Sequence, residues 1–179
     1  MTDNDLIKKY LSWDNSSLEE LLQKHLQGIF SACYRVCLDE ENASDITQNV
    51  VIKIMKWLKN FAFQSEFKTW YYKIAYNESI NFLKKNRENF YLDERIETLP
   101  CENSVIEEIV KNDFAILVTN EINKLPLLER NIVLYYYYDD LKIKEISDIL
   151  WINENTIKTK LSRSKKFLKS KLEIYERNN

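Results

Sequence analysis

The stretch SDILWINENTIKTKLSRSKK, residues 147–166, contains two helical patterns that meet at WIN, residues 151–153. A short helix, a turn of about three residues and a basic second helix are typical of a helix-turn-helix, which places its second helix in the DNA major groove. Such a turn often contains glycine, because glycine adopts positive φ without steric cost. Here Trp151 stands at the corner. We therefore predict the motif, with a strain of order 1 kcal/mol at its corner. The indole could offset this strain by packing over the helix junction, which we favour, or it could form part of a partner surface.

The second of these helices has two different faces. One face is apolar at intervals of three or four residues, at Ile157, Leu161, Ser164, Leu168 and Leu172. Asn153 precedes the helix and is a good N-cap. The other face carries amide, hydroxyl and cationic side chains, which suit base edges and phosphates. The predicted DNA-reading residues are Asn155, Thr156, Lys158, Thr159, Ser162, Arg163 and Lys166.

A basic amphipathic helix has other uses. It can be the solvated cationic side of a bundle, or it can bind a membrane surface or another protein. Taken alone, this helix therefore favours DNA binding but leaves these alternatives open.

The composition predicts an all-α protein. One Gly and two Pro in 179 residues are too few for a β-rich fold with many tight turns. The net charge of −2 argues against a uniformly basic coat for nucleic acid, but the charges are unevenly placed. Residues 142–171 hold nine Lys and Arg against three acids, and residues 86–113 hold three against eight. Such blocks predict surfaces with different partners.

The sequence also limits the compartment and the cofactors. No apolar run reaches the roughly 18–20 residues of a membrane helix, and the first ten residues lack the apolar core of a signal peptide. We therefore expect a cytoplasmic protein without membrane insertion. Cys33 and Cys37, spaced as i and i+4, could be two metal ligands, but His25 is the only histidine. Buried thiols explain the pair better, and we expect no cofactor.

The N-terminal part predicts a bundle of three helices with short connections. The first follows DNSS with Asn15 or Ser16 as its cap, the second follows a cap at Ser44, and the third spans about 68–85. The expected buried residues are Leu18, Leu21, Leu22, Leu26, Ile29, Phe30 and Cys33; Ile46, Val50, Ile54, Trp57 and Phe61, widened by Val51, Met55 and Leu58; and Phe67, Tyr71, Ile74, Ala75 and Phe82.

Periodicity fades after this bundle and then returns. Acids collect around Pro100, which predicts a linker. Further helices are expected at about 104–124, 127–138, 142–150 and 154–173. We therefore predict two small helical domains, a three- to four-helix bundle at 1–87 and a helix-turn-helix domain at 104–179, joined by an acidic linker at 88–103.

Both halves resemble one protein family. LPLLERNIVLYYYYDDLKIKEISDILWINENTIKTKLSRSKKFLKSKL, residues 125–172, resembles region 4 of the extracytoplasmic-function (ECF) class of sigma factors in the sigma-70 family. SDITQNVVIKIMKWLKNFAFQSEFKTWYYKIAYNESINFLKK, residues 44–85, resembles region 2. Because both occur in the family's order, the resemblance implies a non-enzymatic transcription initiation factor. It would bind core RNA polymerase, recognise −35 and −10 promoter elements and promote strand opening.

The resemblance assigns roles to region 2. Holding separated strands requires aromatic surfaces for bases and cations for the backbone. The loop around 62–68 would capture a flipped base of the −10 element, which costs a few kcal/mol to extrude. Without the resemblance, each aromatic here reads as a core residue. The implied −10 and melting residues are Gln64, Ser65, Lys68, Trp70, Tyr72, Lys73, Asn77, Asn81 and Lys84.

The resemblance also implies partners. The helix at 45–59 would dock on the clamp helices of RNA polymerase β′, and region 4 would contact the β flap. Asp45, Gln48, Asn49 and Lys53 are the implied polymerase-binding residues. The acidic linker would thread the polymerase cleft, or it is a spacer without contacts. Double- and single-stranded promoter DNA would be the nucleic-acid partners, and many similar factors have an anti-sigma factor.

Some residues depart from the family pattern. Tyr76 and Asn81 replace a common Arg and Asp, Asn49 replaces an acid, and Glu78 lies on a stripe that is usually apolar. Two other functions stay open. A stand-alone helix-turn-helix regulator explains residues 127–171 but not the N-terminal half, and a helical adaptor that binds only protein needs no DNA contact.

Overall fold

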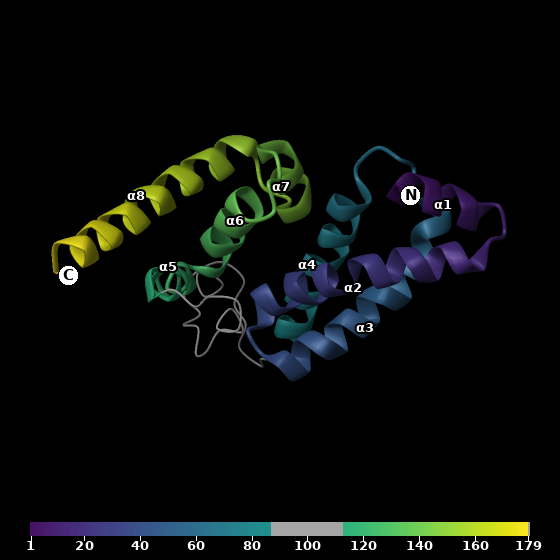
Figure 1. Cartoon of the computed structure of the whole chain (residues 1–179), viewed down its shortest axis with the longest axis horizontal. Coiled ribbons are helices and arrows are strands. Elements are labelled where there is room, and N and C mark those ends of the chain that lie inside the picture. Colours follow the sequence, from purple (N-terminus) through teal and green to yellow (C-terminus); the bar gives the residue numbers. More distant parts are fainter. Residues whose placement is uncertain (87–112, 179) are drawn as a thin grey trace. The chain divides into compact units, whose positions relative to one another are not determined.

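The computed structural model describes residues 1–86 and 113–178, and every regular element in these ranges is helical (Figure 1). The chain divides into two compact units, Met1–Glu88 and Asn89–Asn179. The predicted all-α fold with two small helical domains is confirmed. The expected linker at 88–103 lies outside the described residues.

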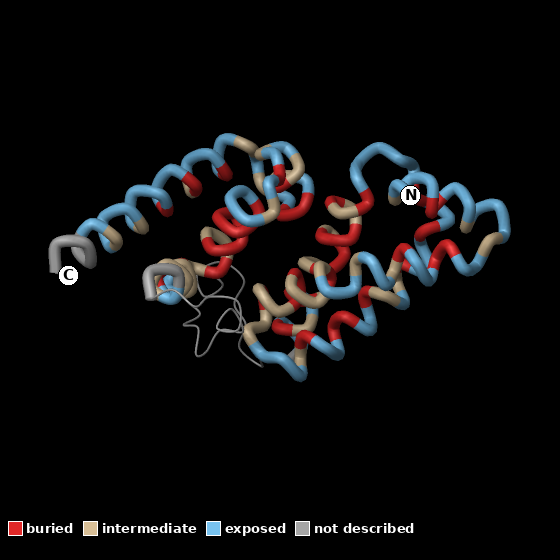
Figure 2. The backbone as a smooth tube through the Cα atoms, viewed as in Figure 1, coloured by how far each residue is buried: buried red, intermediate tan, exposed pale blue. Residues whose placement is uncertain are grey.

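The first unit is a bundle built on three long helices. Its elements are α1 (Asp3–Leu11), α2 (Asn15–Cys37), α3 (Glu40–Trp57), the short 3₁₀ helix η1 (Leu58–Asn60) and α4 (Phe67–Asn86). Helices α2, α3 and α4 pack pairwise, and α1 packs on α2. Figure 2 shows their buried residues on the sides that face one another. The predicted core residues that are buried include Leu18, Leu21, Ile29, Cys33, Ile46, Val50, Ile54, Phe67, Tyr71, Ile74 and Ala75.

Helix α1 was not among the helices predicted from the sequence. Only Leu6 and Ile7 of its nine residues are buried, so no apolar repeat announces it. A reciprocal cap starts the helix: Thr2 Oγ1 accepts a hydrogen bond from Asp5 N at 3.2 Å, and the Asp5 carboxylate accepts one from Thr2 N at 3.0 Å. Helix α1 therefore depends on its cap and on α2 rather than on a wide apolar face.

The two predicted caps are wrong by one to five residues. Helix α2 is capped by Asp14, immediately before the residues that we expected. Helix α3 is capped by Asp39, whose Oδ1 accepts a hydrogen bond from Asn42 N at 2.8 Å, and not by Ser44. A carboxylate also interacts favourably with the positive end of the helix dipole, which a neutral hydroxyl does less well.

Three predicted core positions are largely exposed instead. Trp57 is 45% exposed, and Met55 and Leu26 are exposed to a similar degree. Helix α3 ends at Trp57, and the following turn brings Leu58 and then Phe61 into the core in its place. The buried stripe runs through Val50, Ile54 and Leu58 at intervals of four residues, and Trp57 lies beside this stripe.

The second unit contains α5 (Asp113–Asn123), α6 (Leu127–Tyr137), α7 (Ile143–Leu150) and α8 (Glu154–Asn178). Helices α6, α7 and α8 pack against one another, and α5 contacts α6 and α8. The predicted starts of the last three helices agree with the structure to within one residue. The part of the first expected helix before residue 113 lies outside the described residues.

Candidate nucleic-acid and polymerase interfaces

Helices α7 and α8 form the predicted helix-turn-helix. Ser147 closes the turn: its Oγ donates to Ile152 O at 2.6 Å, and its carbonyl accepts from Trp151 N and Ile152 N. Asn153 caps α8 as predicted, because its Oδ1 accepts a hydrogen bond from Asn155 N at 2.8 Å. Side-chain and backbone hydrogen bonds therefore fix the direction in which α8 leaves the turn.

Contacts with α6 fix the rotation of α8 about its axis. Glu129 of α6 lies 3.4 Å from Lys160 Nζ through Oε1, and its Oε2 accepts from Ser164 Oγ at 3.3 Å. Ile157 and Leu161 are buried on the same side of α8. The opposite side of α8 faces solvent. All seven predicted DNA-reading residues are exposed: Asn155, Thr156, Lys158, Thr159, Ser162, Arg163 and Lys166.

Two residues of this exposed face have local partners. Lys158 Nζ lies 3.9 Å from a carboxylate oxygen of Glu154, and Thr159 Oγ1 donates to Asn155 O at 2.8 Å. An exposed ion pair contributes about 0–1 kcal/mol, so Lys158 can exchange Glu154 for a phosphate at little cost. These local contacts therefore order the exposed face of α8 and still leave its side chains accessible to a partner.

Trp151 has the expected backbone but not the expected packing. Its φ of 58° and ψ of 38° are left-handed, as a helix C-cap requires. The side chain is 69% exposed, so the predicted packing over the helix junction is wrong. Ile149 and Leu150 are buried and fill the interior of the junction from the preceding turn. The indole is therefore left on the surface of the second unit.

An aromatic cluster lies where η1 leads into α4, and its members are Phe61, Phe63, Phe67 and Trp70. Buried Phe61 is its base, with ring centroids 5.0 Å from Phe63, 5.3 Å from Trp70 and 6.3 Å from Phe67. Phe63 is 39% exposed with a φ of 54°, and Trp70 is half-buried. Two accessible rings thus rest on a buried one, which is a suitable platform for stacking a base.

His25 of α2 and Asp3 of α1 support this aromatic cluster. The His25 ring of α2 lies 5.1 Å from Phe67 and 5.3 Å from Tyr71, and its Nε2 is 2.9 Å from Asp3 Oδ2. Partial burial raises the pKa of Asp3, but hydrogen bonds from Lys24 and His25 outweigh this effect and lower it below its ordinary value. Helix α1 therefore braces the start of α4 through His25.

The predicted melting residues do not all face solvent. Tyr72 is only 2% exposed, with its ring 4.9 Å from that of Tyr71, so its proposed contact with DNA is not supported. Helix α4 packs on both α2 and α3, and its buried arc is wider than the single stripe that we predicted. Gln64, Ser65, Asn81 and Lys84 are exposed, whereas Lys68, Trp70, Lys73 and Asn77 are half-buried.

Phe63 is a candidate that the sequence analysis missed. It lies in a loop without helical periodicity, where apolar spacing gives no information about burial. An aromatic residue immediately before the polar run Gln64-Ser65-Glu66 was the available signal.

One face of α3 combines polar and apolar exposed residues. Asp45, Gln48 and Asn49 are exposed as predicted. Ile52 and Met55 continue the same face at helical spacing and are nearly half exposed. Exposed apolar residues rimmed by polar ones are typical of a protein-binding surface, and this apolar part was not predicted from the sequence.

An apolar groove of about 620 Å³ adjoins this face. It lies along α2 between α1 and α3. Its lining residues are Tyr10, Asn15, Leu18, Glu19, Leu22, Gln23, Leu26, Val51 and Met55.

Lys53 behaves differently from its three predicted companions. It is half-buried and forms an ion pair with Glu78 of α4, and its Nζ lies 5.4 Å from the centroid of the Trp57 ring. The ion pair with Lys53 explains why Glu78 is found on a stripe of α4 that was expected to be apolar. Lys53 therefore joins α3 to α4, and this use competes with its predicted contact to polymerase.

Cys33 and Cys37, the two cysteines within the described residues, are free thiols. Cys33 is fully buried, and burial raises its pKa to about 12. Cys37 is half-buried, and its Sγ donates to Cys33 O at 3.2 Å. Across residues 1–86 and 113–178, no group of three or more His, Cys, Asp or Glu could hold a metal ion. No helix in these ranges has the length and apolarity needed to span a membrane.

Comparisons with known proteins agree with this arrangement. The family model for Sigma-70 region 2 matches residues 21–89, and the model for Sigma-70, region 4 matches residues 116–168. The ECF RNA polymerase sigma factor SigW of Bacillus subtilis (strain 168) is 27% identical over 176 residues, which cover 93% of this chain and 94% of SigW. The RNA polymerase sigma factor SigV of the same organism is 26% identical over 148 residues, 83% and 86% of the two chains.

A solved structure has the same fold. The sigma factor RpoE from Bartonella quintana, in a co-crystal with the anti-sigma factor NepR, matches with a TM-score of 0.66 at 16% identity and covers 87% of this chain and 96% of that one. Both regions thus occur in one chain, region 2 before region 4, and the matches span most of this chain and most of the two relatives. The chain belongs to the sigma-70 family, in its ECF class, and is a non-enzymatic factor that directs RNA polymerase to promoters.

Proposed function

We propose that the two units divide promoter recognition between them. Residues 104–179 read the −35 element as duplex DNA through the exposed face of α8. Residues 1–87 bind polymerase and open the −10 element, and residues 88–103 join the two. The observation that carries the proposal is the second unit's helix-turn-helix, in which Asn153 and Glu129 fix a recognition helix whose predicted DNA-reading residues are all exposed.

The chemistry of α8 suits a major-groove reader. Arg163 can donate two hydrogen bonds to a guanine edge, and Asn155 can pair with an adenine edge. Lys158 and Lys166 can neutralise phosphates on either side of the groove. Hydroxyls of Thr156 and Ser162 complete the set, and Thr159 adds a methyl group that can contact thymine.

The chemistry of the aromatic cluster suits a separated strand. A flipped base costs a few kcal/mol to extrude, and stacking on an aromatic ring returns about 1–3 kcal/mol. Phe63 and Trp70 supply accessible rings, and Gln64 and Ser65 supply exposed polar groups beside them. Lys73, Asn77, Asn81 and Lys84 would follow the strand along α4. Tyr72 is left out of this set because it is buried.

The α3 face and the apolar groove beside it suit a helical partner. We assign them to the clamp helices of RNA polymerase β′, with Asp45, Gln48 and Asn49 as polar contacts and Ile52 and Met55 as apolar ones. The second unit would contact the β flap. Because it would act at the polymerase, we expect the protein to be cytoplasmic. The structure of RpoE with NepR makes an anti-sigma factor a further candidate partner.

The −35 assignment is tested with Arg163→Ala and Lys158→Ala in polymerase holoenzyme. Losing a base contact at Arg163 should weaken promoter binding by about 1–3 kcal/mol and relax the base preference at one position. Losing a phosphate contact at Lys158 should weaken binding to all sequences alike and reduce the salt slope by about 1. Lys171→Ala, at the far end of α8, is the matched control. If both substitutions left promoter-specific transcription intact at moderate salt, the recognition-helix assignment would be wrong.

A further inference from the structure

A carboxylate of α1 is linked to the aromatic cluster through one histidine of α2. Asp3 Oδ2 lies 2.9 Å from His25 Nε2, and the His25 ring lies 5.1 Å from the Phe67 ring with an interplanar angle of 67°. The Phe67 ring in turn lies 5.8 Å from that of Trp70 and 6.3 Å from that of Phe61. Centroid distances of about 4.5–7 Å are those of favourable aromatic pairs. An unbroken series of contacts therefore joins α1 to the rings of the proposed base platform.

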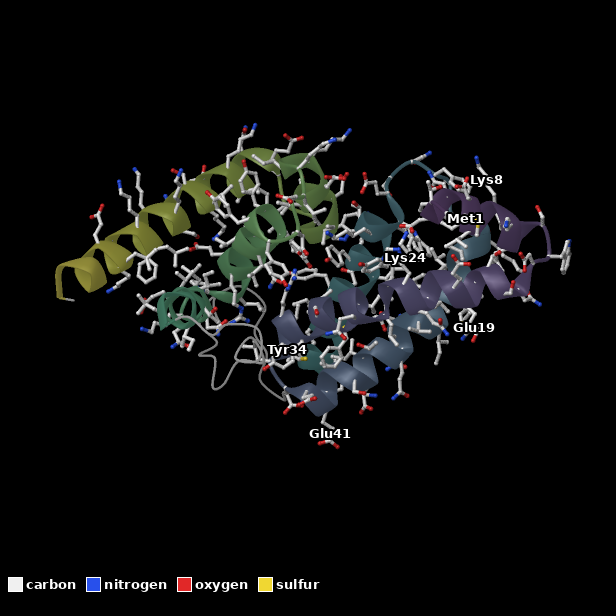
Figure 3. The ribbon with its side chains drawn as sticks, viewed as in Figure 1. Met1, Lys8, Glu19, Lys24, Tyr34 and Glu41 are labelled. Atoms are coloured by element: carbon white, nitrogen blue, oxygen red, sulfur yellow. The ribbon has the colours of Figure 1, made fainter. Side chains whose placement is uncertain are left out.

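Both members of the Asp3–His25 link are held in place. The His25 side chain is 13% exposed and that of Asp3 is 25% exposed. The other carboxylate oxygen of Asp3 accepts a hydrogen bond at 2.7 Å from Nζ of Lys24, which is labelled in Figure 3. Leu6 and Ile7 are fully buried and anchor α1 one turn further along. Asp3 therefore offers the His25 ring a fixed hydrogen-bonding partner.

Phe67 lies where the loop before α4 becomes helix. Residues 61–66 belong to no helix, and Phe67 is the first residue of α4 and is 1% exposed. The loop carries Phe63, Gln64 and Ser65, which are candidates for base capture. Because the loop has no helical hydrogen-bond ladder of its own, its position depends on side-chain contacts at its ends. A binding site works only when its residues are held within about 0.5 Å of the productive geometry, so the contacts that fix Phe67 matter for the loop.

We propose that Asp3 and His25 are positioning residues for strand opening. They hold the Phe67 ring, and with it Trp70 and the loop of Phe63, in the arrangement that accepts a base, without themselves touching DNA. A histidine suits this place because its ring packs on Phe67 as a phenylalanine ring would, while its Nε2 reaches the carboxylate. The role rests on the proposed −10 function of the aromatic cluster and extends it to α1.

The test uses holoenzyme formed from the full chain and core polymerase, on a duplex promoter at which the wild-type holoenzyme initiates. Asp3→Ala should slow opening of the −10 region, followed by permanganate reactivity, roughly five- to tenfold and change the affinity for the closed duplex by less than about twofold. Asp3→Asn keeps the shape of the side chain and a group that can hydrogen bond with Nε2, so it should recover most of the rate. His25→Phe keeps a ring on Phe67 but loses the link, so it should be impaired as Asp3→Ala is. The double variant should be no worse than either single variant, because both remove the same link.

Ile7→Val is the matched control for the stability of α1. It removes part of a buried side chain that anchors α1 and leaves the Asp3–His25 link in place. Opening by this variant should be that of the wild type. Hydrogen exchange of the peptide that covers residues 61–70 gives a second readout, in the full chain without DNA. Exchange there should be faster in Asp3→Ala and unchanged in Ile7→Val.

Trp70→Ala, measured in the same assay, separates the positioning role from the proposed −10 function. Normal opening by Asp3→Ala with impaired opening by Trp70→Ala would overturn the positioning role alone. Normal opening by both would overturn the proposed −10 function as well. Equal losses in Asp3→Ala and Ile7→Val would show that α1 acts only through the stability of the fold. Losses that add in the double variant would show that Asp3 does not act through His25, and either of these two results overturns the positioning role.

Discussion

Gly28, the single glycine of the chain, lies on α2 where Tyr71 of α4 comes closest. A Cβ at this position would be 2.6 Å from Tyr71 Oη and 3.6 Å from its Cζ. Tyr71 is buried and its ring is packed by His25 and Phe67, so it has little room to withdraw. The glycine therefore serves the close approach of two helices beneath the aromatic cluster.

Gly28→Ala should lower the free energy of unfolding of the first unit by about 1–3 kcal/mol, the usual range for overpacking. The sign is informative, because helix propensity alone predicts a gain of about 1 kcal/mol. Urea unfolding followed by circular dichroism measures it. Tyr71→Phe removes the clashing oxygen, so the double variant should lose less stability than the sum of the single variants. Strictly additive losses would contradict the contact.

Cys33 should be unreactive in the folded protein. With a pKa of about 12, almost none of its thiol is ionised at pH 8, and the thiolate is the form that attacks iodoacetamide. Peptide mass spectrometry should find Cys33 unmodified in native protein and modified at an ordinary rate in urea. Half-buried Cys37 provides an internal comparison. Native labelling of Cys33 at the rate seen in urea would show that the core around it opens freely.

The helix boundaries of the second unit were easier to predict than those of the first. The starts of α6, α7 and α8 follow from Pro126, from apolar spacing and from the Asn153 cap, all of which are local signals. Helix α1 has no such repeat, and its burial depends on α2. Tyr72 shows the same limit within one helix, because two neighbours bury α4 on a wider arc than its sequence reveals.

Trp151→Gly should raise the free energy of unfolding of the second unit, by up to about 1 kcal/mol. The left-handed backbone costs a non-glycine residue about 1–2 kcal/mol, and the greater freedom of glycine in the unfolded chain offsets part of the gain. Thermal unfolding measures the change. Asp148→Gly, at an exposed position inside α7, is the control and should lose about 1 kcal/mol. A less stable Trp151→Gly would mean that the indole stabilises the helix junction after all.

The uneven distribution of charge along the chain agrees with the different roles proposed for the two units. The basic block lies on α7 and α8, and α8 carries the proposed DNA-reading face, although the net charge is only −2. The family, and with it the polymerase partner, could be predicted from paired motifs in the sequence. Exposed apolar residues such as Trp13, Phe63 and Ile52 could not, because single residues outside a repeat do not reveal their exposure until the helices are packed.

This chain directs polymerase to promoters, and we propose that it opens them with the aromatic cluster. Reconstituted transcription with core polymerase, on the DNA upstream of the protein's own coding sequence, tests it most directly. The wild type should give a promoter-specific transcript and a permanganate-reactive −10 region. Trp70→Ala should bind the closed duplex nearly as the wild type but fail to open it. No promoter-specific transcript with the wild type would contradict the function as a promoter-directing factor. Equal loss of binding and opening with Trp70→Ala would contradict the role of the aromatic cluster in opening.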